Sequence, residues 1–120
     1  MSQVYSANGS VKISNEAIAI IAGTAAQEVE GVLTPAGEDG ERGKRNFAKG
    51  VKVGVTGDRA KVARVKVAIN ISVREGYGIS EVSAAVQRKV KTAIETMTGM
   101  FVAAVDVYVQ GLAGAKRNEP

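Results

Sequence analysis

Nine basic side chains between residues 42 and 66 are the part of this sequence best suited to binding. That segment holds a single acid, whereas residues 1–41 hold six acids and one base. The net charges are −5 for residues 1–41, +8 for residues 42–66 and +1 for the remainder. Such a concentration of positive charge attracts polyanions or acidic protein surfaces. The nine bases are Arg42, Lys44, Arg45, Lys49, Lys52, Arg59, Lys61, Arg64 and Lys66.

Residues with catalytic potential are few. The 120 residues include no histidine and no cysteine, which excludes imidazole bases, thiol nucleophiles and most zinc, haem and iron-sulfur sites. Glu38, Asp39 and Glu41 have no second group of acids to complete a divalent-cation site, so they are interpreted as a solubilising patch. Gly54–Gly57 and Gly111–Gly114 are G-x-x-G spacings without the strand-to-helix context of a phosphate loop. We therefore predict no catalytic, metal-binding or cofactor-binding residues, and no enzyme activity.

The clearest structural signal lies between Tyr77 and Gln110. Apolar residues recur there at spacings of three and four, which predicts one buried stripe along a helix. The stripe consists of Val82, Val86, Val90, Ala93, Ile94 and Met97. Ser80 is expected to cap the start of this helix, and Gly99 to end it. Beyond Gly99 the period changes to two, which predicts a strand with valines on one face and Asp106, Tyr108 and Gln110 on the other.

The earlier elements follow the same two periods. A strand is expected at 9–13 and a first helix from Ser14 or Asn15, with an alanine-rich apolar face. Residues 31–34 are either a short strand or the entry to the loop that follows. Two strands are expected at 51–55 and 64–73, where valine or isoleucine alternates with polar residues. One apolar and one polar sheet face is typical of an antiparallel sheet covered by helices on one side. The predicted fold is an α+β two-layer sandwich, a mostly antiparallel sheet of three to five strands with two helices on one face.

This pattern predicts a single domain over residues 9–112. Residues 1–8 are expected to be a flexible N-terminal arm, residues 35–49 a mobile charged loop, and residues 113–120 a flexible tail. The partner-binding residues are then expected on the loop and on the polar sheet face. They are Lys44, Arg45, Lys49, Lys52, Arg64, Lys66, Asn70 and Tyr108.

The partner of this surface is left open between three classes. Its charge suits RNA or DNA, but the five aromatic residues show no paired arrangement for base stacking. An anionic partner protein is the second class. The third is the acidic segment of another copy, because the segregation of charge favours head-to-tail self-association.

Several short motifs resemble the alkaline shock protein family of bacterial envelope stress proteins, from about Gly9 to Leu112. The matching stretches are 9–14 (GSVKIS), 28–32 (EVEGV), 49–53 (KGVKV), 77–78 (YG), 86–87 (VQ), 97–99 (MTG) and 105–111 (VDVYVQG). The resemblance implies a small cytosolic α+β domain without known catalysis that tends to self-associate. Some members of the family lie beneath the membrane by binding a separate membrane-anchored protein.

The sequence and the resemblance together predict a noncatalytic scaffold or interaction protein of cell-envelope stress homeostasis, of the general stress protein type. It is expected to be cytoplasmic, to form homo-oligomers, and to reach the inner face of the cell membrane through a partner protein. No apolar run approaches the roughly twenty residues of a membrane helix, and no signal peptide is recognised, so direct insertion is not expected. The alternative is a basic RNA- or DNA-binding module.

Overall fold

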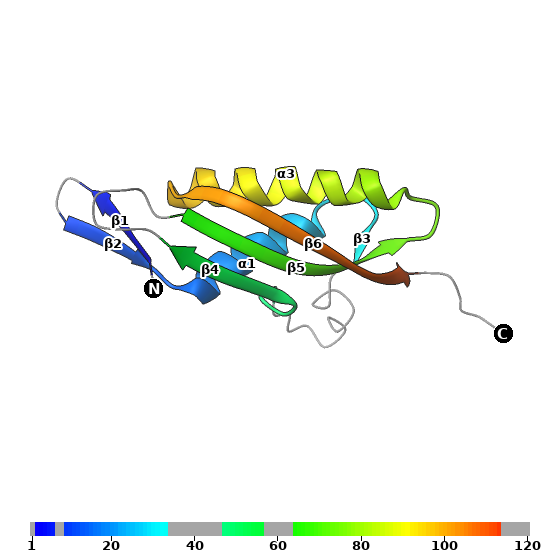
Figure 1. Ribbon diagram of the computed structural model, residues 1–120, viewed down its shortest axis with the longest axis horizontal. Coiled ribbons are helices and arrows are strands. Elements are labelled where there is room, and N and C mark those ends of the chain that lie inside the picture. The colour runs from blue at the N-terminus through cyan, green and yellow to red at the C-terminus, as the bar shows by residue number, and fades with distance from the viewer. Residues whose placement is uncertain (1, 7–8, 34–46, 57–63, 114–120) are drawn as a thin grey trace.

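A computed structural model describes residues 2–6, 9–33, 47–56 and 64–113 of the chain. Two helices and six strands follow one another in these ranges (Figure 1). The helices are α1 (Asn15–Gln27) and α3 (Ile79–Thr98). The strands are β1 (Ser2–Ser6), β2 (Gly9–Ile13), β3 (Val32–Leu33), β4 (Val51–Thr56), β5 (Arg64–Arg74) and β6 (Phe101–Ala113).

Strand β5 is the centre of the main sheet. Strand β6 pairs with it in parallel along its whole length, from Arg64 opposite Phe101 to Arg74 opposite Ala113. A strand has two edges, so the antiparallel partners β4 and β3 share the other edge, one after the other. The parallel pair arises because α3 carries the chain back between β5 and β6, as in a β-α-β unit. The remaining described pairings are antiparallel, in agreement with a mostly antiparallel sheet.

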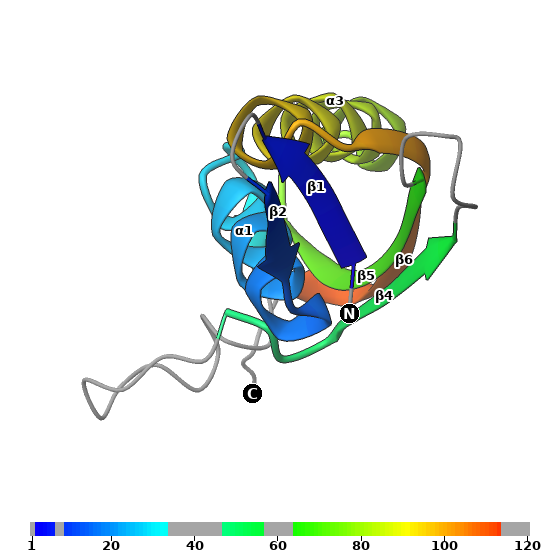
Figure 2. The same cartoon turned by 90° about the vertical axis from the view of Figure 1, so that its left-hand side faces the viewer.

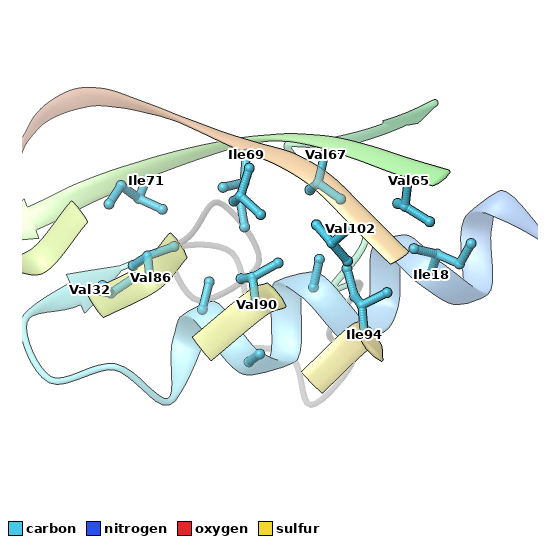
Figure 3. Packing of buried hydrophobic residues seen from close by; sticks show 14 of the residues in the cluster. Ile18, Val32, Val65, Val67, Ile69, Ile71, Val86, Val90, Ile94 and Val102 are labelled. Atoms are coloured by element: carbon cyan, nitrogen blue, oxygen red, sulfur yellow. The ribbon is translucent and has the colours of Figure 1, made fainter. Parts of the chain in front are cut away.

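The core lies between the sheet and the two helices, which cover one face (Figures 1 and 2). Every second residue of β5 from Val65 to Val73 is at most 1% exposed. These side chains contact the alanine-rich side of α1 and the valine stripe of α3 (Figure 3). Small residues let helices approach closely, which fits the direct packing of α1 on α3. The α+β two-layer sandwich predicted from the alternating periods is thus confirmed.

The start of α1 and the end of α3 agree with the sequence. Helix α1 ends at Gln27, earlier than the stop at Gly31 that the sequence indicates, and α3 starts at a different residue from the expected one. Ser14 caps α1, because its hydroxyl accepts a hydrogen bond from the Ala17 amide at 3.0 Å. Gly99 ends α3 in a left-handed conformation with φ 76°. Ser80 is not the cap of α3: Gly78 holds that position, and its carbonyl accepts the first helical bond from Val82 at 3.0 Å. The extended backbone of Gly78 starts the helix two residues earlier than the side chains suggest.

The buried stripe of α3 ends on Thr98 and not on Met97. Met97 is 68% exposed, whereas Thr98 is 7% exposed. Steps of four from Val82 lead to position 98, and the polar side chain is tolerated because both of its hydrogen-bonding roles are filled. The Thr98 hydroxyl donates to the Ile94 carbonyl at 2.6 Å and accepts from the Met100 amide at 3.0 Å.

Two segments that the sequence analysis describes as mobile contain ordered parts. Residues 2–6, placed in a flexible arm, form β1, which pairs with β2 from Ser2 opposite Ile13 to Ser6 opposite Gly9. Most of the loop at 35–49 lies outside the described residues, but its end forms a turn over residues 47–50. This turn packs directly on α1: a Cβ on Gly23 would lie 1.7 Å from the Phe47 carbonyl oxygen. The glycine inside the helix is therefore explained by close backbone packing.

Candidate interaction surface

The side of the sheet that faces away from the helices, here called the open face, carries most of the predicted binding residues. The side chains of each strand alternate between the core and this side. No helix or strand in the described part of the chain lies over it (Figures 1 and 2). The open face consists of Lys52, Gly54 and Thr56 on β4, Arg64, Lys66, Ala68, Asn70, Ser72 and Arg74 on β5, and Ala104, Asp106 and Tyr108 on β6.

The strand register brings three predicted cations together on one half of this face. Lys52 is opposite Ala68, and Lys66 is opposite Gly54, so the two lysines are diagonal neighbours. Diagonal pairs on one face of a sheet lie about 7–8 Å apart. Arg64 lies two residues before Lys66 on the same strand. All three side chains are exposed, which makes this half of the face positively charged.

Small residues separate these cations. In the row of Lys66, the neighbours on the two adjacent strands are Gly54 and Ala104, and Ala68 lies beside Lys52. A Cβ on Gly54 would meet nothing within 4 Å. A partner can therefore approach the strand backbone closely at Gly54 and Ala68, while the side chains of Lys52 and Lys66 contact the partner from either side.

The other half of the open face carries Asn70 and Tyr108, with Asp106 between the two halves and Arg74 at the far end of β5. Asn70 is opposite Tyr108, so an amide and a phenol lie side by side. The Tyr108 ring is mostly exposed, and Asn70 is half-buried. Amphipathic aromatic residues such as tyrosine are enriched in protein interfaces, so this pair extends the cationic half into a mixed binding surface.

The remaining predicted residues are not all part of this face. Lys44 and Arg45 lie outside the described residues. Lys49 is exposed in the turn that leads into β4 and is not part of the open face. The structure thus brings Lys52, Arg64, Lys66, Asn70 and Tyr108 together, and that grouping follows from the alternation already visible in the sequence.

Phe101 is exposed near this surface but is not among the predicted binding residues. Its ring lies beside Arg64 at the start of the parallel ladder, with the Arg64 guanidinium 5.5 Å and the Lys91 ammonium 5.9 Å from the ring centroid. Both distances are within the range of a cation-π contact. No local pattern indicates this cluster, because its three residues come from three different elements.

Tyr77 forms a polar contact at the opposite end of β5. Its phenol donates a hydrogen bond to Glu30 Oε2 at 3.0 Å. This hydrogen bond, and then the negative charge of Glu30, raise the pKa of Tyr77 above its usual value near 10. The neighbouring Arg74 opposes the shift. The contact joins the end of α1 to the turn before α3.

Comparison with known proteins identifies the chain. The model of the alkaline shock protein family, which is described as having a cell envelope-related function, matches residues 3–113. The chain belongs to the alkaline shock protein family. The resemblance found in the sequence is thereby confirmed, and the family ties this chain to the cell envelope.

Three relatives cover most of the chain. Uncharacterized protein YloU of Bacillus subtilis (strain 168) is 35% identical over 87% of this chain and 88% of its own length. Uncharacterized protein YqhY of the same strain is 33% identical, with coverages of 87% and 77%. Uncharacterized protein Spy1614 of Streptococcus pyogenes serotype M6 is 29% identical, with coverages of 92% and 93%. No solved structure gives a significant match.

Neither α1 nor α3 has the length and apolar character needed to cross a bilayer. Within the part of the chain that the structure describes, no three aspartates or glutamates come together as a cluster that could hold a metal ion.

Proposed function

We propose that this member of the alkaline shock protein family is a noncatalytic scaffold of cell-envelope stress homeostasis. It self-associates, and a membrane-anchored partner protein holds it at the inner face of the cell membrane. The cell envelope-related function of the family supports the cellular role. The resemblance to alkaline shock proteins supports the recruitment by a partner.

The observation that carries the proposal is the uncovered cationic half of the open face. Lys52, Arg64 and Lys66 form a positive cluster there, and Tyr108 supplies an exposed aromatic ring on the same side of the sheet. Complementary charge speeds the encounter of two proteins and sets their orientation, whereas buried aromatic residues provide most of the affinity. The open face therefore suits an acidic protein segment with an apolar anchor.

Binding to isolated membranes tests this proposal. Purified chain is sedimented with membranes from the native cell, before and after the membranes are treated with protease. We expect binding to intact membranes, loss after protease treatment, and no binding to protein-free vesicles of anionic lipid. Equal binding to those vesicles would contradict recruitment by a protein.

A pair of charge-matched variants tests the surface. Lys66→Glu lies on the open face, and Arg88→Glu lies exposed on α3; both change the net charge equally. We expect Lys66→Glu to weaken membrane binding by roughly tenfold or more, a change equivalent to about 1.4 kcal/mol. Arg88→Glu should bind as the unmodified chain does. An equal loss in both variants would mean that net charge matters and the open face does not.

Nucleic acid binding is the second candidate, and one observation favours it. Phe101 lies beside Arg64 and Lys91, Tyr108 lies further along the same strand on the open face, and single-stranded RNA binds to sheets that combine basic and aromatic residues. RNA retained without any protein partner, with an affinity that falls steeply with salt, would support this candidate.

A further inference from the structure

The two ends of the β5–β6 ladder carry different chemistry. Because the strands are parallel, both begin at the same end of the ladder, with Arg64 opposite Phe101, and the β1–β2 hairpin lies beyond that end (Figure 1). Both finish at the other end, with Arg74 opposite Ala113. Figure 1 shows β6 running along β5 between these ends. We call them the Phe101 end and the Tyr77 end.

The Phe101 end presents an aromatic ring beside two cations. Phe101 is 46% exposed, and the charged groups of Arg64 and Lys91 lie within 6 Å of its ring centroid. The cations hold the ring in place without covering it. An exposed ring of this kind can be buried only by something outside the described part of the domain.

The Tyr77 end contains a pocket of about 570 Å³. Its apolar wall is formed by Tyr77, Ile79 and Leu112, whose side chains are 40%, 46% and 57% exposed. Glu75 and Glu81 add two carboxylates to the lining. The remaining lining residues are Arg74, Gly76, Gly78 and Ser80.

The wall of this pocket is formed in advance. The Tyr77 phenol is fixed by its hydrogen bond to Glu30. Its ring lies against Gly31, where a Cβ would come within 2.8 Å of the ring carbons. Gly31 has φ +92°, so the sequence keeps a glycine where both the backbone and the ring require one. A ligand therefore does not have to order this side chain on binding.

We infer that the Phe101 end of one copy binds the Tyr77 pocket of the next copy. The inference rests on the proposed self-association and assigns its interface. The Phe101 ring would enter the pocket and pack against its apolar wall. Arg64 and Lys91 would then lie opposite Glu75 and Glu81 at the rim of the pocket. Ligand pockets typically measure about 300–1,000 Å³, so 570 Å³ accommodates an aromatic side chain.

A second copy fits this pocket because the same chain carries both complementary halves. They lie at opposite ends of one strand pair, both carry apolar side chains, and the lining of the pocket is net negative, with two carboxylates against Arg74 alone. A contact between two different surfaces is heterologous, so every added copy leaves one free end of each kind. The result is an open row of copies in which the open face points sideways, available to the membrane partner.

Sedimentation velocity of the full chain at low salt, over a range of concentrations, tests the interface. Phe101→Ser removes the ring, and Leu112→Lys puts a cation into the pocket wall. We expect the unmodified chain to grow beyond a dimer and each variant alone to remain monomeric. An equimolar mixture of the two variants should give a 1:1 dimer and nothing larger, because one variant keeps its pocket and the other keeps its ring.

Ile20→Ser is the matched control. Ile20 is 42% exposed on α1, away from both ends of the ladder, and its loss should leave assembly unchanged. Thermal melting checks the folding of every variant, and Lys91→Glu and Ile79→Lys provide a second variant for each end. Either should also keep the chain monomeric.

The outcomes separate this interface from self-association itself. A strictly monomeric unmodified chain would overturn both. Assembly of the unmodified chain together with equal assembly of Phe101→Ser and Leu112→Lys would overturn the interface alone. A mixture that stays monomeric would also overturn the head-to-tail arrangement.

Discussion

Replacing Gly23 with alanine should destabilise the domain, although alanine is the better helix former. In an exposed helix interior this exchange would stabilise by up to about 1 kcal/mol. In the structure the new Cβ would lie 1.7 Å from the Phe47 carbonyl oxygen and 2.8 Å from its carbon. These are backbone atoms, so the turn at 47–50 must move by more than an ångström. Overpacking of this kind costs about 1–3 kcal/mol.

We therefore expect Gly23→Ala to lower the free energy of unfolding by about 1–2 kcal/mol net, with a fall in Tm of roughly 4–8 °C for each kcal/mol. Urea and thermal unfolding followed by circular dichroism measure both quantities. Gly54→Ala is the control, because a Cβ at Gly54 would meet nothing within 4 Å. That variant should be as stable as the unmodified chain, or more stable by up to about 1 kcal/mol. A Gly23→Ala protein that is more stable than the unmodified chain would refute the packing of the turn on α1.

Three further changes test other contacts. Tyr77→Phe removes the hydrogen bond to Glu30. In the unmodified chain the pKa of Tyr77 is raised on folding. The stability that this bond provides is therefore present below about pH 10 and is lost as the pH rises through the folded pKa. Unfolding measured from pH 8 to 12 should show a steeper alkaline loss in the unmodified chain than in Tyr77→Phe, and parallel curves would contradict the contact. Val86→Asp places a charge at a position that is 0% exposed, at a cost of several kcal/mol; a cooperatively melting Val86→Asp protein would disprove the assignment of the buried stripe. Thr98→Val removes the hydroxyl that accepts from the buried Met100 amide and should cost about 1–3 kcal/mol by urea unfolding, so an unchanged midpoint would count against that bond.

Local periods were enough to predict the elements from β2 onward and the two sheet faces, but not β1. Alternation along β5 and β6 assigned Lys66, Asn70 and Tyr108 to the side away from the core, because the side-chain period of a strand depends only on neighbouring residues. The helical stripe was read in the same way, with an error at its end. Thr98 can take the buried position in place of Met97 because its hydroxyl is hydrogen-bonded to the Ile94 carbonyl and to the Met100 amide. Periodicity does not reveal these two hydrogen bonds.

Contacts between distant segments could not be predicted. The cluster around Phe101 depends on the parallel pairing of β6 with β5, which places Arg64 opposite a residue 37 positions later. The need for glycine at positions 23 and 31 arises from Phe47 and Tyr77, which are far away in the sequence. Composition and spacing indicate that such residues are present, but only the register of the sheet determines which of them meet.

Chemical labelling of lysines tests the role of the open face most directly. The chain is acetylated with a lysine reagent once when free and once when bound to membranes of the native cell, and the extent of labelling is read by mass spectrometry. Lys52 and Lys66 on the open face should be protected in the bound chain, whereas Lys89 on α3 should be labelled equally in both states. Unchanged labelling of Lys52 and Lys66 in chain that is demonstrably bound would contradict the proposal that the open face receives the partner.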